Sequence, residues 1–279
     1  MKYLLLDYDG FMAKSYYASK SKDNDTQDTP IDILLDLEES SIKKAREYFG
    51  EDEEIIVLKI TSGHSYKKDI FPGYKGKRKR DEEFGEFREY VKENFDITLA
   101  DNLEADDLIT LINDLTDQEC LVISDDKDLR YYNRLVSKIN PTEPIIEQDF
   151  TVMAENKYIQ MIEGDSIDCI KGIPRKGEVW SRKYLDKNGY SIESVIKAYK
   201  ESGVDIDECL KNLVEVIPLN FYFLKDEYHK FAIDLLHNSG DKYSNTMKVI
   251  EGFIRSLSEN IKEIYYNDSK SKKDDEEGT

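Results

Sequence analysis

The sequence predicts an α/β fold, in which a central, mostly parallel sheet is flanked by helices and followed by a helical region. Two observations lead to this prediction. Short apolar segments alternate with amphipathic segments through residue 150, as in successive βαβ units. Beyond Pro144 the strand pattern fades and helices of moderate length replace it. In such a fold, ligands bind outside the carboxyl ends of the parallel strands.

The predicted elements follow one another in a regular order. The apolar run Lys2–Asp7 predicts a buried strand that ends in a carboxylate and is followed by a helix. The polar stretch 20–30 predicts a mobile loop. The further predicted elements are helix 31–49, strand 54–60, a loop or partly helical excursion over 61–80, helix 82–94, strand 97–100, helix 105–115 and strand 121–124. Helices 153–163, 191–201, 207–216, 225–237 and 245–265 are predicted in the second half, before a disordered tail over 267–279.

Composition narrows the class of protein. The 279 residues carry a formal charge of −19, which ordinarily argues against a polyanionic partner. The 39% of hydrophobic residues is enough to bury a sizeable core. Three widely spaced cysteines indicate reduced thiols in a cytoplasmic protein. No apolar run approaches the ~18 residues that cross a bilayer, so we expect no membrane partner.

Acidic residues gather where predicted strands end or helices begin. Any one cluster can simply cap a helix, because a helix N-terminus favours negative charge. Their recurrence favours a cation site instead, since converging carboxylates repel one another unless Mg²⁺ or Mn²⁺ neutralises them. The clusters are Asp7, then Glu104, Asp106 and Asp107, then Asp126 and Asp128, and finally Asp165 and Asp168.

Two basic segments interrupt this acidic chain. Residues 67–80 carry seven Lys and Arg against one Asp, a local charge of +6, and include Phe71 and Tyr74. A solvated loop is the simple interpretation, whereas cations interleaved with aromatic rings favour nucleic acid. Residues 171–187 carry a local charge of +4 around the turn 172–177, whose backbone amides could hold a phosphate. The candidate DNA contacts are Lys67, Lys68, Tyr74, Lys77, Lys79, Arg80, Lys171, Gly172, Arg175, Lys176, Gly177, Arg182 and Lys183.

In this order and spacing, the segments resemble the 5′-nuclease family: flap endonucleases, the 5′-nuclease domain of bacterial DNA polymerases and bacteriophage 5′-3′ exonucleases. The resemblance is strongest to a bacteriophage member, which would place the protein in the host cytoplasm. The segments that carry it are Leu4-Leu-Leu-Asp7, Pro72-Gly-Tyr74-Lys75-Gly-Lys-Arg78, Glu104-Ala-Asp106-Asp107, Ser124-Asp-Asp126-Lys-Asp128-Leu129 and Gly164-Asp165-Ser-Ile-Asp168 followed by Gly172-Ile-Pro174.

The resemblance implies a PIN-like nuclease core over 1–150 with a basic helical arch at about 61–95. It also implies a helical DNA-binding region over 151–266 with a helix-turn-helix-type motif. Two Mg²⁺ ions, with Mn²⁺ as substitute, would clamp one scissile phosphodiester. The implied ligands are Asp7, Glu104 and Asp106 for a tighter site, Asp126 between the sites, and Asp128, Asp165 and Asp168 for the second site, with Asp107 in support. Lys75 and Arg78 would act with Asp126 in catalysis by holding the scissile phosphate.

The implied activity is hydrolysis near the 5′ ends of branched or nicked DNA or RNA–DNA duplexes, releasing 5′-phosphate products. The implied partners are DNA with 5′ ends, flaps or RNA primers, and a single-strand-binding protein or polymerase clamp, with the enzyme as a monomer. Two other interpretations stay open. One is a branched-DNA-binding protein with reduced or lost nuclease activity, and the other is an acidic replication scaffold.

Three departures from the family pattern bear on these interpretations. The family's further metal-ligand Asp at the end of the second strand is absent from the stretch 59–62, so that Asp9 or a water would have to fill its place. Arg175 and Lys176 replace the small apolar pair of the duplex-binding turn. Asp125 is one acid more than the pattern needs, and we expect it to be solvated.

Overall fold

The computed structural model of the chain describes residues 2–21, 28–65, 67–78, 81–100, 103–116, 118–205, 207–208 and 211–212. The described residues fall into two compact units, which we treat separately. Unit 1 comprises the described parts of 1–66 and 78–153, and unit 2 those of 67–77 and 154–217. The expected helices 225–237 and 245–265, most of helix 207–216 and the tail 267–279 lie outside the described residues.

Unit 1 contains a six-stranded sheet in the order β3-β2-β1-β4-β5-β6. All neighbouring strands are parallel except the last pair, in which β6 runs antiparallel to β5. This confirms the predicted mostly parallel α/β fold. The strands are β1 (Lys2–Asp7), β2 (Ile55–Ser62), β3 (Thr98–Ala100), β4 (Cys120–Ile123), β5 (Leu135–Ser137) and β6 (Ile146–Glu147).

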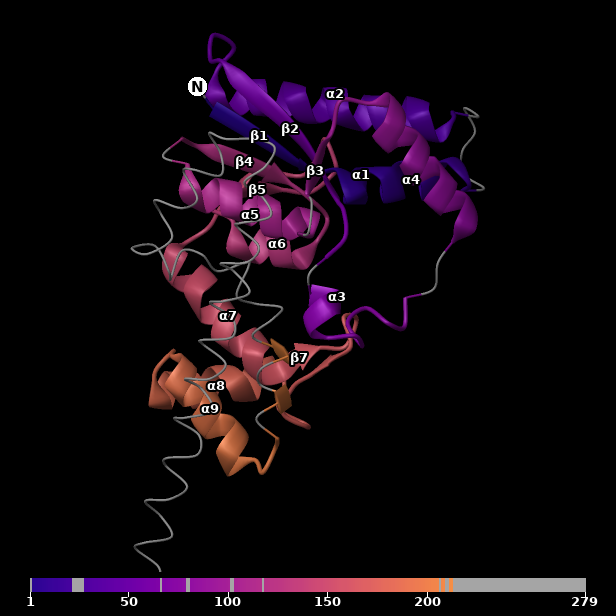
Figure 1. Ribbon diagram of the computed structural model, residues 1–279. Coiled ribbons are helices and arrows are strands. Elements are labelled where there is room, and N and C mark those ends of the chain that lie inside the picture. Colours follow the sequence, from indigo (N-terminus) through magenta and orange to yellow (C-terminus); the bar gives the residue numbers. More distant parts are fainter. Residues whose placement is uncertain are drawn as a thin grey trace, which may run out of the picture. The chain divides into compact units, whose positions relative to one another are not determined.

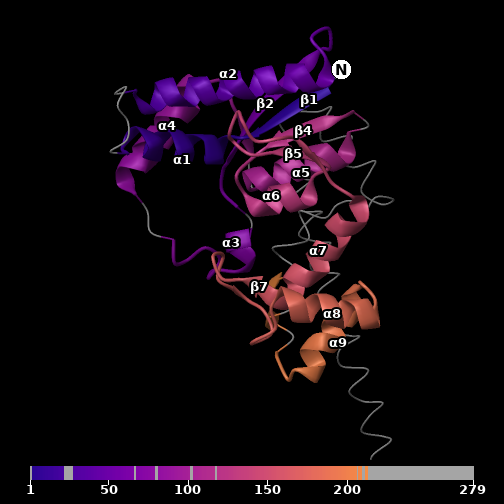
Figure 2. The same ribbon diagram turned by 180° about the vertical axis from the view of Figure 1, so that it is seen from behind.

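Helices cover both faces of this sheet (Figures 1 and 2). They are α1 (Tyr8–Ser19), α2 (Pro30–Phe49), α4 (Glu82–Asn94), α5 (Ala105–Leu115) and α6 (Lys127–Tyr132). Leu4 and Leu6 of β1 share a buried core with Phe11 of α1, Leu34 of α2 and Val91 of α4. Because side chains alternate along a strand, Leu5 faces the opposite side, where α5 contacts β1 and β2.

Local sequence explains where the helices of unit 1 begin. Thr29 and Asp32 form a capping box at the start of α2, and Pro30 occupies the first turn, where no backbone donor is needed. Asp81 caps α4 by accepting a hydrogen bond from the backbone of Phe84. Among the described residues, no helix is long and apolar enough to cross a membrane.

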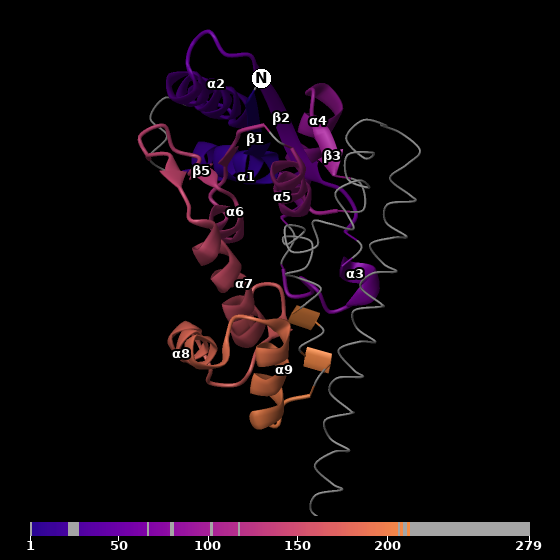
Figure 3. The ribbon, with the colours of Figure 1, turned by 90° about the vertical axis from the view of Figure 1, so that its left-hand side faces the viewer.

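Unit 2 consists of short helices and a small hairpin. Its elements are α3 (Lys67–Ile70), the part of α7 (Phe150–Glu163) after residue 153, β7 (Gly164–Asp165), β8 (Ile170–Lys171), α8 (Glu178–Asn188) and α9 (Ile192–Glu201). Figure 3 shows its helices α3, α7, α8 and α9. β7 and β8 pair antiparallel directly after α7. A Cβ on Gly172 would lie 2.1 Å from the carbonyl carbon of Glu163, so only glycine fits here.

No strand was predicted after 121–124, whereas the described residues contain four more. β5 and β6 extend the sheet, and the β7–β8 hairpin stands between α7 and the basic turn, so the turn follows a strand rather than a helix. These strands have only two or three residues, which is too short for an alternating pattern to emerge from a sequence.

Candidate active site

Asp7 stands at the junction between β1 and α1 in the centre of the unit 1 sheet. Its carboxylate accepts hydrogen bonds from Ser124 Oγ at 2.6 Å and from the Gly10 backbone at 3.3 Å. Burial raises the pKa of Asp7 to about 7, and the charges of Asp9 and Asp126 contribute, while the Ser124 hydrogen bond opposes the rise. A Cβ on Gly10 would lie 2.9 Å from Asp7 Oδ2, so this glycine makes room for the carboxylate.

The adjacent strand, β2, ends without an acid. The register pairs Asp7 with Ile60, and Thr61 and Ser62 follow. Both residues instead donate to Asp9, Thr61 through Oγ1 at 2.6 Å and Ser62 through its backbone N–H at 2.9 Å. Asp9 therefore brings a carboxylate to the end of β2 from α1.

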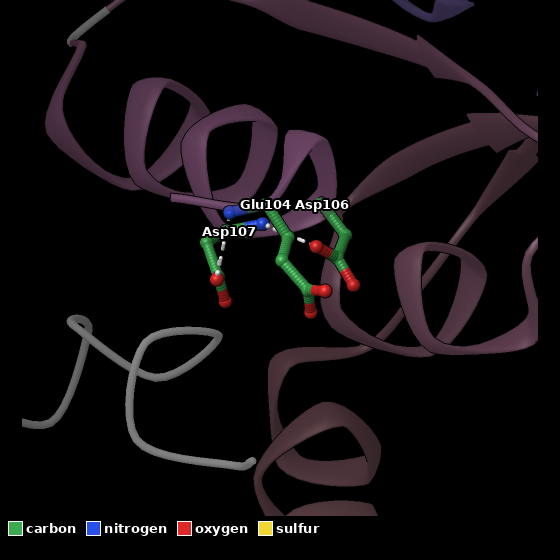
Figure 4. Close-up of side chains that lie close together, drawn as sticks. All are labelled: Glu104, Asp106 and Asp107. Carbon is green, nitrogen blue, oxygen red and sulfur yellow. Dashed lines mark hydrogen bonds between the residues drawn. The ribbon is translucent and has the colours of Figure 1, made fainter. Parts of the chain in front are cut away.

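Three acids meet at the start of α5. Carboxylate oxygens of Glu104, Asp106 and Asp107 lie within 4.8 Å of one another, and Figure 4 shows the three groups turned to the same side. Part of the cluster also caps the helix, since the Glu104 backbone donates to Asp107 Oδ2 at 3.3 Å. An all-oxygen donor set of carboxylates fits Mg²⁺ or Mn²⁺, which prefer such ligands.

The segment after β4 supplies further acids. Asp126 caps α6 and accepts from the backbone of Asp128, which is itself buried. The Asp126 backbone donates to Ser124 Oγ at 2.9 Å, so Ser124 links Asp7 to the start of α6. Asp125 is exposed, as expected, but is also bonded, because it pairs with Lys14 at 3.0 Å and accepts from the Ile139 backbone at 3.1 Å.

Asp165 and Asp168 belong to unit 2, where both are buried in the turn between β7 and β8. Asp165 Oδ1 accepts from the backbones of Ile167 and Asp168, at 2.8 Å and 3.3 Å. Asp168 Oδ2 accepts from the Tyr74 hydroxyl at 3.2 Å and lies 3.7 Å from Lys75 Nζ. The segment 67–77 is thus bound to this turn through one of the predicted metal ligands.

Two residues of the first basic segment are not placed as expected. Tyr74 is buried, with its hydroxyl on Asp168, so its ring does not offer the predicted stacking surface. Lys67 is fully buried with its Nζ 5.8 Å from the centre of the Tyr74 ring, so it does not present its charge to solvent. Lys68, Lys77 and Arg78 are exposed, whereas Lys79 and Arg80 lie outside the described residues.

The second basic segment is partly engaged in contacts within unit 2. Lys176 Nζ lies 4.3 Å from the centre of the Trp180 ring. Arg182 pairs with Glu155 at 3.3 Å and with Glu178 at 3.2 Å. The exposed members of this predicted DNA-binding set are Lys171, Arg175, Gly177 and Lys183, while Gly172 is half-buried.

Sequence reasoning missed two polar residues of unit 1. Ser124 bridges Asp7 and Asp126, and Arg88 of α4 donates to Asp9 Oδ1 at 2.7 Å. The sequence did offer a signal for Ser124, because a serine directly after an apolar strand lies at the carboxyl edge of the sheet. Arg88 carried none, since a charged residue on an amphipathic helix is usually solvated.

Comparisons with known proteins agree on one family. A family model for the N-terminal resolvase-like domain of 5′-3′ exonucleases matches residues 2–161. The DNA polymerase I of Rhizobium leguminosarum is 24% identical over 207 residues, which are 66% of this chain but only 20% of the polymerase. This chain thus spans about a fifth of that relative's length.

Solved structures show the same fold. A bacteriophage T5 flap endonuclease in complex with DNA and metal ions is 17% identical, with a TM-score of 0.57 over 95% of this chain and 100% of that one. A T5 5′-exonuclease with bound zinc is 18% identical, with a TM-score of 0.54 over the same shares. Because the family model covers more than half of the chain, from β1 into α7, this protein belongs to the 5′-3′ exonuclease family with a resolvase-like N-terminal domain.

Proposed function

We propose that this protein is a divalent-metal-dependent 5′ nuclease. It hydrolyses phosphodiester bonds near the 5′ ends of branched or nicked DNA, or of RNA–DNA duplexes, and it leaves 5′-phosphate products. The proposal includes Mg²⁺ as the working cation. It also includes the assignment of residues 1–150 to the nuclease core and of 151–266 to DNA binding.

The observation that carries this proposal is the presence of two groups of acids in unit 1. Asp7 and Asp126 end neighbouring segments that Ser124 ties together, and Glu104, Asp106 and Asp107 form a compact donor set at the start of α5. A divalent cation bound to such acids would neutralise the attacked phosphate and activate water. The carboxylates hold the cation, and we assign to Lys75 and Arg78 the binding of the scissile phosphate.

Cleavage of a 5′-flap duplex in Mg²⁺ or Mn²⁺ tests the enzymatic claim. We expect cleavage by the wild-type chain and loss of cleavage in Asp126→Ala, measured as product formed in single-turnover conditions. Asp125→Ala is the matched control, because Asp125 is adjacent but pairs with Lys14 outside the acid set. A substrate that binds and stays intact with both metals would reject the proposal.

Lys75 has a role that kinetics can separate from binding. We expect Lys75→Ala to lower the single-turnover rate by roughly 100-fold, with DNA affinity changed by less than about threefold, if the lysine acts in the transition state. Lys68→Ala, which removes an exposed cation of the same segment, should weaken binding more than it slows cleavage. Equal losses of affinity and rate in Lys75→Ala would contradict the transition-state role.

A second candidate function is binding of branched DNA without efficient cleavage. The end of β2 favours it, because Thr61 and Ser62 stand there with no carboxylate of their own. A structure determined from crystals soaked in Mn²⁺ distinguishes the two functions. Two cations about 3.5 to 4 Å apart support the nuclease, whereas a single cation or none supports the binding protein.

A further inference from the structure

Arg88 and Asp9 form an ion pair at the end of β2. The Arg88 guanidinium donates to Asp9 Oδ1 at 2.7 Å, and the side chains are only 29% and 27% exposed. Arg88 is the third partner of this carboxylate, after the Thr61 hydroxyl and the Ser62 backbone. Asp9 is therefore held by strand β2 and by helix α4 at once.

Ser62 continues this chain of contacts toward the acid cluster. Its backbone N–H donates to Asp9, and its Oγ accepts at 2.9 Å from the backbone of Ala105. Ala105 is the first residue of α5 and lies between Glu104 and Asp106. Hydrogen bonds thus join Arg88 through Asp9 and Ser62 to the backbone at the start of α5, next to the residues of the acid cluster and entirely within unit 1.

Negative and positive charges are not balanced along these hydrogen bonds. Asp9 is two residues from Asp7 on the first turn of α1, so its negative charge adds to that of the neighbouring acids. Among the described residues, Arg88 contributes the one charged donor to Asp9, since Thr61 and Ser62 are neutral. Arg88 Nε is buried and has no hydrogen-bond partner within the described residues, so attraction to Asp9 has to outweigh that unmet donor.

We infer that Arg88 is a positioning residue that serves as the resident counter-ion of Asp9 and keeps this carboxylate out of the divalent-metal site. Asp9 does not replace the acid that β2 lacks. It forms a neutral pair with Arg88, and the acids of unit 1 carry one uncompensated charge fewer. This inference rests on the proposed function, because it concerns the affinity of the same acids for a cation.

Titration of the full chain with Mn²⁺ in a calorimeter, without DNA, tests the inference. Arg88→Met removes the positive charge but keeps an apolar stem, and we expect Mn²⁺ to bind about fivefold more tightly because Asp9 is left uncompensated. Asp9→Asn leaves the positive charge unpaired, and we expect Mn²⁺ to bind about fivefold more weakly. The double variant restores neutrality and should return to within about twofold of the wild type.

Opposite signs in the single variants are the decisive result. A merely structural ion pair predicts weaker binding in both single variants, and that outcome overturns the inference. Should Arg88→Met not fold, Arg88→Gln removes the same charge and takes its place, alone and combined with Asp9→Asn, because only charge compensation makes such a double variant bind better than Asp9→Asn. Lys92→Met is the matched control, since Lys92 lies one turn further along α4 and pairs with Glu89.

The cleavage assay and the Mn²⁺ titration test the proposed function and the counter-ion role of Arg88 independently. Opposite shifts in Mn²⁺ affinity together with no cleavage would reject the proposed function and leave the counter-ion role of Arg88 standing. Cleavage together with unchanged Mn²⁺ affinity in Arg88→Met would reject the counter-ion role and leave the nuclease standing. A wild-type chain that binds no Mn²⁺ rejects both.

Discussion

At the scale of single residues, Asp7 shows how burial and function oppose each other. A buried carboxylate surrounded by other acids is easier to protonate than to ionise, yet a metal ligand has to be ionised. The Ser124 hydroxyl and the Gly10 backbone support the charged form only in part, because the pKa stays raised to about 7. Without a cation, the native fold therefore holds this carboxyl in a strained electrostatic environment.

This strain predicts how stability depends on pH in a chelating buffer. A carboxyl whose pKa is higher in the folded than in the unfolded state stabilises the fold at low pH, and that contribution disappears as pH rises from about 4 to about 7. Asp7→Asn removes the titration and should be more stable than the wild type at pH 8 by roughly 2 kcal/mol. Thermal melting at pH 5 and pH 8 in EDTA measures the difference.

Two outcomes decide this prediction. The advantage of Asp7→Asn should shrink at pH 5, and it should reverse in saturating Mn²⁺, since only the wild type gains stability from metal binding. Asp186→Asn, at an exposed position on α8, is the control and should show neither effect. An equal advantage at both pH values would contradict the raised pKa.

At the scale of secondary-structure elements, the length of an element decides whether its bounds can be predicted from the sequence. Helices 82–94 and 105–115 were predicted with the bounds that the structure has, because three to four turns display a clear apolar stripe and a capping acid. The acids were likewise expected at strand ends and helix starts, and Asp7, Glu104 and Asp126 occupy such positions. Their metal-binding roles remain predictions.

Features that depend on contacts between residues distant in the chain could not be predicted from the sequence. Tyr74 was expected to be a stacking surface, but it is buried against Asp168, which is 94 residues away in the chain. The sequence likewise gives no signal for the β7–β8 hairpin, because its two-residue strands form through packing rather than through strand propensity. The residues around a side chain in the sequence do not show whether a segment that is distant in the sequence will cover it in the fold.

The hairpin of unit 2 supports a prediction about the glycines of the basic turn. Gly172→Ala should destabilise unit 2 by roughly 3 kcal/mol, because its Cβ would overlap the Glu163 backbone. Gly177→Ala is the control, since a Cβ there meets nothing within 4 Å. Amide hydrogen exchange should show lost protection in α8 and α9 only in Gly172→Ala, with α2 unchanged in both. Loss of DNA binding with full protection would instead assign Gly172 to the DNA contact alone.

At the scale of the whole molecule, charge is segregated along the chain. The sequence carries −19 overall, yet segments 67–80 and 171–187 carry +6 and +4, so the remainder carries −29. Such a remainder repels a nucleic acid, so we expect its contacts at the two basic segments. A net acidic protein is therefore compatible with a polyanionic substrate, provided that a small number of cations make the contacts.

Because only a few Lys and Arg side chains of this acidic protein would contact DNA, we expect DNA binding that is weak and dominated by those cations. We expect the double variant Lys68→Gln/Lys77→Gln to reduce the slope of log affinity against log salt by about 1.5, since each lost phosphate contact removes about 0.7 to 0.9. Lys43→Gln/Lys197→Gln removes the same charge from exposed helix positions outside the basic segments, where each lysine is paired with a glutamate. Fluorescence anisotropy with a labelled 5′-flap duplex, in an Asp126→Ala background that prevents cleavage, measures both slopes. The basic segment 67–80 is the DNA contact only if the first pair lowers the slope and the second leaves it unchanged, whereas equal changes would mean that net charge alone governs binding.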